Sequence, residues 1–244
     1  MPLVSKGKVL GVLNVETNKP GAFTEATREF LTTIAQQASG AIENARLYEM
    51  LEGSYFDTIR TLVLAMDAKD PYTRGHSERV RRYAVELARA LGMPEEEVKQ
   101  VSYAALLHDI GKIGIREEVL LKPGELTPEE FEEVKLHSIV GQKLVENVAI
   151  LKGVGPIIRS EHENYGGWGY PDGLTGEQIP LGARVVAVAD AYDAMTTDRA
   201  YQKETTSRKA IAELRKCAGS QFDPRVVEAL AEIVGEEEEV TKKA

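Results

Sequence analysis

Carboxylates stand inside otherwise apolar helical segments, and this placement restricts the folds open to the chain. The segment VSYAALLHDI carries His108 and Asp109 at its end, and ARVVAVADAYDAM carries Asp190 at its centre. An ionised carboxylate on a buried helix face is costly unless a cation or hydrogen-bond donor pairs with it. These segments therefore predict helices that pack together with their carboxylates directed at a stabilising partner.

Two further histidines fall on the apolar faces of their own predicted helices. His76 shares a face with Val80, Tyr83, Ala84, Leu87 and Leu91, and His137 shares one with Val134, Gly141, Leu144 and Val148. A single histidine on such a face is more often a packed core residue than a ligand. Several helices that each direct a metal-capable group inward favour a metal site instead.

From about residue 69 onward the pattern is helical. The run Thr127–Pro128–Glu129–Glu130 is a capping box with proline at the first helical position. The segment VSYAALLHDI (101–110) is expected to form a helix that continues to Gly111. A glycine-rich loop at 166–176 precedes a helix at 183–195, and two more helices are expected at 207–216 and 224–234. The predicted fold class is mainly α.

The N-terminal segment has a different pattern. Residues 8–17, KVLGVLNVET, predict a buried strand, and NKPG (18–21) predicts a turn. Thr24 is the expected cap of a helix that runs to about Ala68. A helix of that length exceeds an ordinary globular one, so part of it is predicted to be a linker or a coiled-coil dimer stalk.

Composition excludes several classes of protein. The formal net charge of −9 argues against a DNA- or RNA-binding surface. No apolar run reaches the roughly 18 residues that a membrane-spanning helix needs. The lone Cys217 fits a reducing compartment, so the expected location is cytoplasmic. An anionic substrate is still compatible, provided that metal ions and a few cationic side chains reverse the field locally.

The N-terminal part resembles the C-terminal half of a GAF domain that runs into its exit helix. The resemblance is carried by GVLNVET (11–17), PGAFTEATREFL (20–31) and QQASGAIENARLYE (36–49). It covers only part of such a domain, so it implies a small α/β remnant at 1–45 and a linker helix at 46–68, without a sensor pocket. A homodimer through the linker helix is expected.

The helical part resembles the HD-GYP family of the HD phosphohydrolase superfamily. The motifs are HDIGKIGI (108–115), LLKPGELTPEEFEEVKLH (120–137), EHENYGGWGYPDGL (161–174) and VADAYDAMTTDRAY (188–201). The resemblance implies an HD-type helical bundle at 69–236, followed by an acidic and polar tail at 237–244. It also implies a metal-dependent phosphodiesterase that converts cyclic di-GMP to linear pGpG and, in a second round, to GMP.

The same resemblance implies a set of site residues. The metal ligands would be His76, His108, Asp109, His137, His162 and Asp190, with Asp109 between two divalent ions, Fe or Mn, that share the attacking hydroxide. Lys112 would contact a phosphate oxygen. Tyr170 and Arg199 would line the substrate groove, and Arg74 is expected near it. Because Tyr72 occupies the position of a further acidic ligand, two metals are expected.

Departures from the family pattern leave alternatives open. Glu161 stands where the family has the first histidine of His-His-Glu, which keeps an oxygen ligand and favours harder ions. An altered metal set with activity retained is the favoured interpretation. A catalytically weakened dinucleotide-binding signalling module, or an HD hydrolase of another phosphorylated nucleotide, are the alternatives. A second departure is Gln202, for which Lys203 is expected to substitute.

Smaller expectations concern the surroundings of these residues. Asp193, three residues after Asp190, is predicted to orient a ligand. The side chains of Arg79, Arg81 and Arg82 are predicted to be solvated. Stacking on a guanine and simple surface packing are equally compatible with Trp168.

Overall fold

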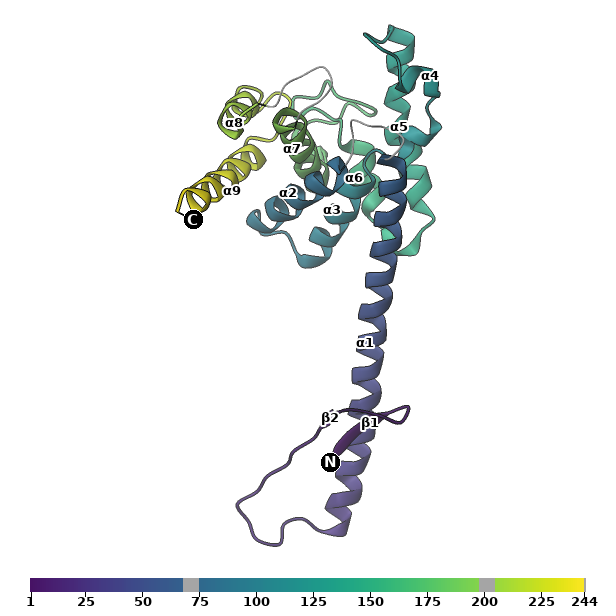
Figure 1. Cartoon of the computed structure of the whole chain (residues 1–244), viewed down its shortest axis with the longest axis vertical. Helices are drawn as coiled ribbons and strands as arrows, with labels where there is room; N and C mark the ends of the chain where they lie inside the picture. Colours follow the sequence, from purple (N-terminus) through teal and green to yellow (C-terminus); the bar gives the residue numbers. More distant parts are fainter. Residues whose placement is uncertain (68–74, 198–204, 244) are drawn as a thin grey trace. The chain divides into compact units, whose positions relative to one another are not determined.

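The structure is a computed structural model that describes residues 1–67, 75–197 and 205–243 (Figure 1). It divides into two compact units, residues 1–61 and 62–244. The elements are β1 (Pro2–Ser5), β2 (Lys8–Val12), α1 (Glu25–Asp67), α2 (His76–Ala90), α3 (Glu95–Leu107), η1 (Ile110–Gly114), α4 (Glu117–Leu120), α5 (Pro128–Glu146), η2 (Ala149–Leu151), α6 (Val154–Ser160), η3 (Gly176–Gln178), α7 (Leu181–Thr196), α8 (Ser207–Lys216) and α9 (Pro224–Lys243). The predicted fold class, mainly α with a small N-terminal β element, is confirmed.

The first unit begins with a two-stranded antiparallel hairpin in which Pro2 pairs with Val12. The prediction of a buried strand over residues 8–17 was wrong in both length and burial. Strand β2 ends at Val12, and its residues are exposed or half-buried. A hairpin of two short strands has too little surface to bury its own faces. The predicted turn at 18–21 is present.

Helix α1 begins where its cap was predicted. The Thr24 hydroxyl accepts a hydrogen bond from the backbone N–H of Thr27 at 3.2 Å, and the first helical residue is Glu25. The helix then continues to Asp67, the last residue described before the gap at 68–74, so its expected end near Ala68 lies outside the described residues. It carries several exposed apolar side chains, among them Ile34, Ile42, Leu47, Leu51 and Tyr55.

The core of the second unit is built on α2, which packs against α3, α7 and α9. Its inner face repeats at three- and four-residue steps through His76, Val80, Ala84 and Leu87, all of them buried. Helix α7 is buried along most of its length because alanine and valine dominate it. The polar residues that point inward from these helices therefore lie among apolar side chains.

A close crossing of η1 and α5 brings the His108–Asp109 turn against His137. A Cβ atom at Gly111 would overlap the carbonyl oxygen of His137 and lie 2.6 Å from the backbone nitrogen of Gly141. Only glycine permits this approach. The expectation that the α-helix continues to Gly111 was wrong: α3 ends at Leu107, and the 3-10 helix η1 follows from Ile110.

Helix α5 has the predicted start but a different inner face. The Thr127 hydroxyl accepts from the N–H of Glu130 at 3.3 Å, and the Glu130 carboxylate accepts from the N–H of Thr127 at 2.7 Å. His137 and Gly141 are buried as predicted, whereas Leu144 is exposed. Val148 is also exposed, because the helix ends before it; Ser138 and Val145 complete the buried face instead.

Of the remaining helices, α7 and α8 match their predicted ranges closely. Helix α9 begins at Pro224 as expected and continues to Lys243, so the acidic run 236–239 is helical. Across the residues that the structure describes, no helix combines the length and apolar character needed to cross a membrane.

Candidate metal centre

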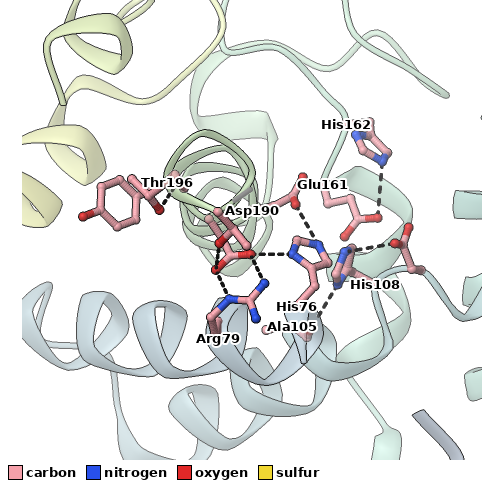
Figure 2. A network of polar contacts seen from close by, with 12 residues as sticks. His76, Arg79, Ala105, His108, Glu161, His162, Asp190 and Thr196 are labelled. Carbon is pink, nitrogen blue, oxygen red and sulfur yellow. Dashed lines mark hydrogen bonds and ion pairs between the residues drawn. The ribbon is translucent and has the colours of Figure 1, made fainter. Parts of the chain in front are cut away.

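The first cluster of metal-capable groups consists of His76, His108 and Asp109, each of which offers a ligand atom within 4.8 Å of the others. His76 begins α2 and His108 follows the last residue of α3, so the packing of these two helices brings the rings together at 5.3 Å. Asp190 on α7 joins them, with its Oδ1 3.1 Å from His76 Nε2. Figure 2 shows His76 and His108 side by side, with Asp190 reaching toward His76 from α7.

The second cluster consists of His137, Glu161 and His162, again with ligand atoms within 4.8 Å of one another. The Nε2 atoms of His137 and His162 are 3.1 Å apart. Oε1 of Glu161 lies 3.6 Å from Nε2 of His137 and 3.5 Å from Nε2 of His162. Helix α6 ends at Ser160, and the chain leaves it with Glu161 and His162 directed at α5.

Hydrogen bonds at Nδ1 direct the Nε2 atoms of three histidines into these clusters. His108 Nδ1 donates to the Ala105 carbonyl at 2.8 Å, and His137 Nδ1 donates to the Val134 carbonyl at 2.6 Å. His76 Nδ1 lies 2.7 Å from Oδ2 of Asp193. A proton held at Nδ1 leaves the Nε2 lone pair available as a ligand, which is the usual arrangement of a metal-binding imidazole.

Arg79 holds Asp193 in place, and the prediction that this arginine is solvated was wrong. Its Nε donates to Asp193 Oδ1 at 2.7 Å, and a terminal nitrogen donates to Oδ2 at 3.0 Å. The Asp193 carboxylate is buried, so a bidentate guanidinium stabilises its charge. The sequence feature that could have indicated this role for Arg79 is its spacing, because residue 79 lies one helical turn after His76.

The second cluster contains an unsatisfied buried anion. Glu161 is only 4% exposed, and neither of its carboxylate oxygens has a hydrogen-bond partner within the described part of the chain. A buried carboxylate that accepts no hydrogen bond is strongly unfavourable. Imidazole nitrogens and carboxylate oxygens are ligands of divalent transition metals. The residues present therefore fit bound divalent cations.

The charges of the site act on its titratable groups. Burial lowers the pKa of His76, but the carboxylates of Asp190 and Asp193 outweigh it and raise the value to about 9. Burial opposes ionisation of Asp109, yet the charges of Lys112 and His108 hold the pKa of that carboxyl well below its usual range. Lys112 Nζ donates to Asp109 Oδ2 at 2.7 Å. The structure thus places the predicted phosphate-binding lysine directly beside the first cluster.

Tyr170 is brought to the second cluster by the folded loop after His162. Its ring stacks on the His162 imidazole with centroids 4.9 Å apart and planes inclined by 24°. Gly169 makes this possible, because a Cβ atom there would overlap the backbone of residues 162–164. Burial raises the pKa of the Tyr170 hydroxyl above its ordinary value.

Glu163 fixes the same loop, although nothing in the motif spacing assigns it this contact. Its buried carboxylate accepts the backbone N–H groups of Asp172 at 2.7 Å, Gly173 at 3.1 Å and Leu174 at 3.0 Å. Arg159 then donates two hydrogen bonds to the Asp172 carboxylate. The neighbouring glutamates therefore differ: Glu163 accepts three backbone hydrogen bonds, whereas Glu161 accepts none from the residues that the structure describes.

A cavity of about 230 Å³ opens beside the clusters. It lies between α7 and the loop that follows α6. Its lining includes Glu161, His162, Tyr170, Asp190, Gln221 and Phe222. Trp168 is 64% exposed and is not part of this lining.

Five residues that the sequence singled out lie outside the described residues: Tyr72, Arg74, Arg199, Gln202 and Lys203.

Comparison with known families agrees with this geometry. The model of the HD domain family matches residues 61–226, and that of the GAF domain matches residues 1–43. The chain therefore belongs to the HD domain family, and its N-terminal part is similar to part of a GAF domain.

Among individual proteins, the chain is 39% identical over 192 residues to a cyclic di-GMP phosphodiesterase of Thermotoga maritima, covering 78% of this chain and 51% of that protein. It is 34% identical over 200 residues to 3'3'-cGAMP-specific phosphodiesterase 3 of Vibrio cholerae, covering 82% and 43%. The chain spans about half the length of these curated relatives.

The fold is also similar to that of a solved structure. A crystal structure of the cyclic GMP-AMP-specific phosphodiesterase V-cGAP3 of V. cholerae superimposes with a TM-score of 0.60 at 20% identity, covering 73% of this chain and 48% of that one. The similarity concerns the arrangement of the helices.

Proposed function

We propose that this chain is a metal-dependent phosphodiesterase that hydrolyses a cyclic dinucleotide, with cyclic di-GMP as the favoured substrate. The observation that carries the proposal is the buried carboxylate of Glu161, which has no hydrogen-bond donor among the described residues and faces two imidazole Nε2 atoms. The names of the curated relatives support the substrate class.

In this proposal two divalent metal ions, Fe or Mn, are held by residues of both clusters. The ligands are His76, His108, Asp109, His137, Glu161, His162 and Asp190. Ions held there supply Lewis-acid stabilisation of the phosphoryl oxygens and a nucleophile at neutral pH. Asp193 and the carbonyls of Ala105 and Val134 act through the imidazoles that they orient.

The remaining site residues bind the substrate in this scheme. Lys112 carries positive charge at the edge of the first cluster and stabilises the phosphate, while Tyr170 lines the groove beside His162. Arg199 and Arg74 are proposed as further substrate-binding residues. In the reaction, water adds its oxygen to phosphorus, one P–O3′ bond breaks, and the released 3′ oxygen takes up a proton. The product is linear pGpG, and a second cleavage gives GMP.

Product analysis tests the proposal directly. Protein reconstituted with Mn or Fe(II) is expected to convert cyclic di-GMP to pGpG, and protein stripped with a chelator is expected to leave it intact. Chromatography of the nucleotides separates the outcomes. The absence of linear product from metal-replete protein would contradict the proposed activity.

A second candidate substrate is 3'3'-cGAMP, which is favoured by the similarity to the Vibrio cholerae relative named for it. The two substrates differ in one base, so the proposed metal chemistry is common to both. Comparison of kcat/KM for cyclic di-GMP, 3'3'-cGAMP and cyclic di-AMP decides between them. An HD hydrolase of another phosphorylated nucleotide would instead turn over none of the three.

Glu161 also motivates a signalling alternative, in which the site binds the dinucleotide but has lost turnover. Its negative charge reduces the positive field available to a phosphate. The variant Glu161→His separates these functions. Turnover that appears only in the variant would favour a binding module, whereas activity already present in the wild-type protein favours the enzyme.

The proposed organisation around this activity has a GAF remnant at 1–45, a linker helix at 46–68, the HD-GYP domain at 69–236 and a tail at 237–244. Exposed apolar side chains along α1 support a homodimer formed through that helix. A monomer in light scattering would contradict it.

The single Cys217 supports a cytoplasmic location.

A further inference from the structure

An aromatic row leads away from the second cluster toward the outer face of α5. The row consists of His162, Tyr170 and Phe131. Tyr170 stacks on His162, and its ring then meets the Phe131 ring edge to face, with centroids 6.4 Å apart and planes inclined by 79°. The metal-capable imidazole is therefore continuous with an apolar ring on a neighbouring helix.

Phe131 is not a core residue of α5. It remains 46% exposed, while the buried face of the helix runs through His137, Ser138 and Gly141. Part of the apolar surface of the Phe131 side chain is therefore exposed to water beside a polar site. A flat ligand that stacks on the ring buries this surface, which is favourable. Edge-to-face contact with Tyr170 orients the Phe131 ring, and the exposed part of the ring is accessible to such a ligand.

Lys135 places a positive charge over the same rings. It follows Phe131 by four residues, which puts both on one side of the helix. Its Nζ lies 4.9 Å from the Phe131 centroid and 5.6 Å from the Tyr170 centroid. The ion pair of Nζ with the exposed Glu132 is an intrahelical surface contact of small net free energy. An anion at this position can exchange with Glu132 at little cost.

We infer that Phe131 and Lys135, together with Tyr170, form a nucleobase subsite: one base of the cyclic dinucleotide stacks on Phe131 while Lys135 pairs with the adjoining phosphate. The inference rests on the proposed function and adds the residues on α5 that determine affinity for the substrate. A base linked through ribose to a phosphate combines a flat π-face with a nearby anion, which matches the ring and ammonium group. These residues do not belong to the clusters, so they affect binding more than the chemical step.

Equilibrium dialysis with the hydrolysis-resistant bisphosphorothioate analogue of cyclic di-GMP measures the subsite. With Mn-replete protein, Phe131→Ala is expected to weaken binding about tenfold, the factor that one base–aromatic stack contributes. Phe131→Leu keeps apolar bulk on the helix and is expected to weaken it similarly, whereas Phe131→Tyr retains the affinity. Leu144→Ala, at an exposed apolar position of the same helix, is the matched control and is expected to bind as wild type does.

For Lys135, removal of the charge in Lys135→Met is expected to weaken binding and to flatten its dependence on salt, while Lys135→Arg retains both. In turnover assays with cyclic di-GMP, Phe131→Ala should raise KM and leave kcat at saturation near the wild-type value. Wild-type affinity in both Phe131→Ala and Phe131→Leu would overturn the inference, as would a wild-type protein that does not bind the analogue. Tight binding of the analogue that depends on Phe131, without any linear product from cyclic di-GMP, would sustain the subsite and overturn the phosphodiesterase proposal.

Discussion

At the scale of single residues, Glu161 and Glu163 are chemically identical side chains in opposite electrostatic situations. Both are buried, but Glu163 accepts three backbone N–H groups and Glu161 accepts no hydrogen bond within the described ranges. A buried charge without donors destabilises the metal-free protein and is stabilised when a cation binds. The two residues therefore form a natural pair of test and control positions.

Glu161→Gln is expected to stabilise the metal-free protein by roughly 1–3 kcal/mol, because it removes a buried charge that accepts no hydrogen bond from the described residues. It should also reduce the increase in melting temperature that Mn produces and lower the bound metal per chain. Thermal unfolding with and without chelator, combined with elemental analysis, measures both effects. Glu163→Gln is expected to destabilise both forms, and the same behaviour from Glu161→Gln would contradict a ligand role.

Asp193 contacts His76 directly, and its removal is expected to weaken metal binding at that imidazole. Loss of a carboxylate that orients a ligating imidazole typically weakens metal affinity by about 10–100-fold. Asp193→Asn is therefore expected to weaken Mn binding in competition with a chromogenic chelator. Glu228→Gln, which breaks an exposed pair with Arg215, serves as the control. Equal Mn affinity in the two variants would exclude an orienting role for Asp193.

The sequence indicated which residues meet in the two clusters, but it did not indicate the hydrogen bonds by which other residues hold them in place. A histidine or aspartate on an apolar helix face is conspicuous because burial without a partner is costly. The contacts of Arg79 and Glu163 depend on which segments meet in three dimensions, and no local pattern encodes that. Glu161 was noticed only because it departs from a family motif, and its lack of donors became visible only with the loop in place.

At the scale of elements, helix starts were predicted better than buried helix faces, again because starts depend on local contacts and faces on tertiary ones. The capping groups of Thr24 and Thr127 are local and were predicted to the residue. The inner face of α5 was wrong at Leu144 because packing against η1 and α6, rather than periodicity alone, decides which side chains are covered. The end of α3 was misplaced because the close approach of Gly111 to α5 is a tertiary contact.

This approach makes Gly111→Ala informative. The added methyl group would overlap the His137 carbonyl, so η1 must move away from α5. Overpacking of this kind is expected to cost about 1–3 kcal/mol in the free energy of unfolding and to weaken metal binding, since His108 lies two residues before η1 and His137 lies on α5. Urea denaturation and Mn titration measure the two effects.

Gly235→Ala is the control for that substitution. It lies in α9 with open space around the position of a Cβ atom, so alanine is expected to raise stability by about 0.5–1 kcal/mol through helix propensity. If Gly111→Ala proved as stable as wild type and bound Mn equally well, the crossing of η1 and α5 would not position the turn at His108–Asp109.

At the scale of the whole molecule, a buried ion pair connects the helix that carries Asp190 to the C-terminal helix. Arg184 of α7 donates to Asp223, the residue before α9, at 2.6 Å, and both side chains are largely buried. Burial favours the protonated carboxyl of Asp223, but Arg225 and Arg184 outweigh this and lower its pKa below the ordinary value. The pair lies outside both clusters, so its titration reports on the fold.

Because the pKa of Asp223 is lower in the folded chain than in the unfolded one, the unfolded state binds the proton more readily. The pair then contributes its full stability above the ordinary carboxyl pKa of about 4, and the contribution is lost as pH falls through the lowered folded value. Asp223→Asn is expected to reduce the free energy of unfolding at neutral pH and to show a shallower loss toward acid. Urea denaturation from about pH 7 to about pH 3 measures the slope. Parallel acid limbs in the variant and the wild type would mean that other carboxylates account for the acid sensitivity of the helical unit.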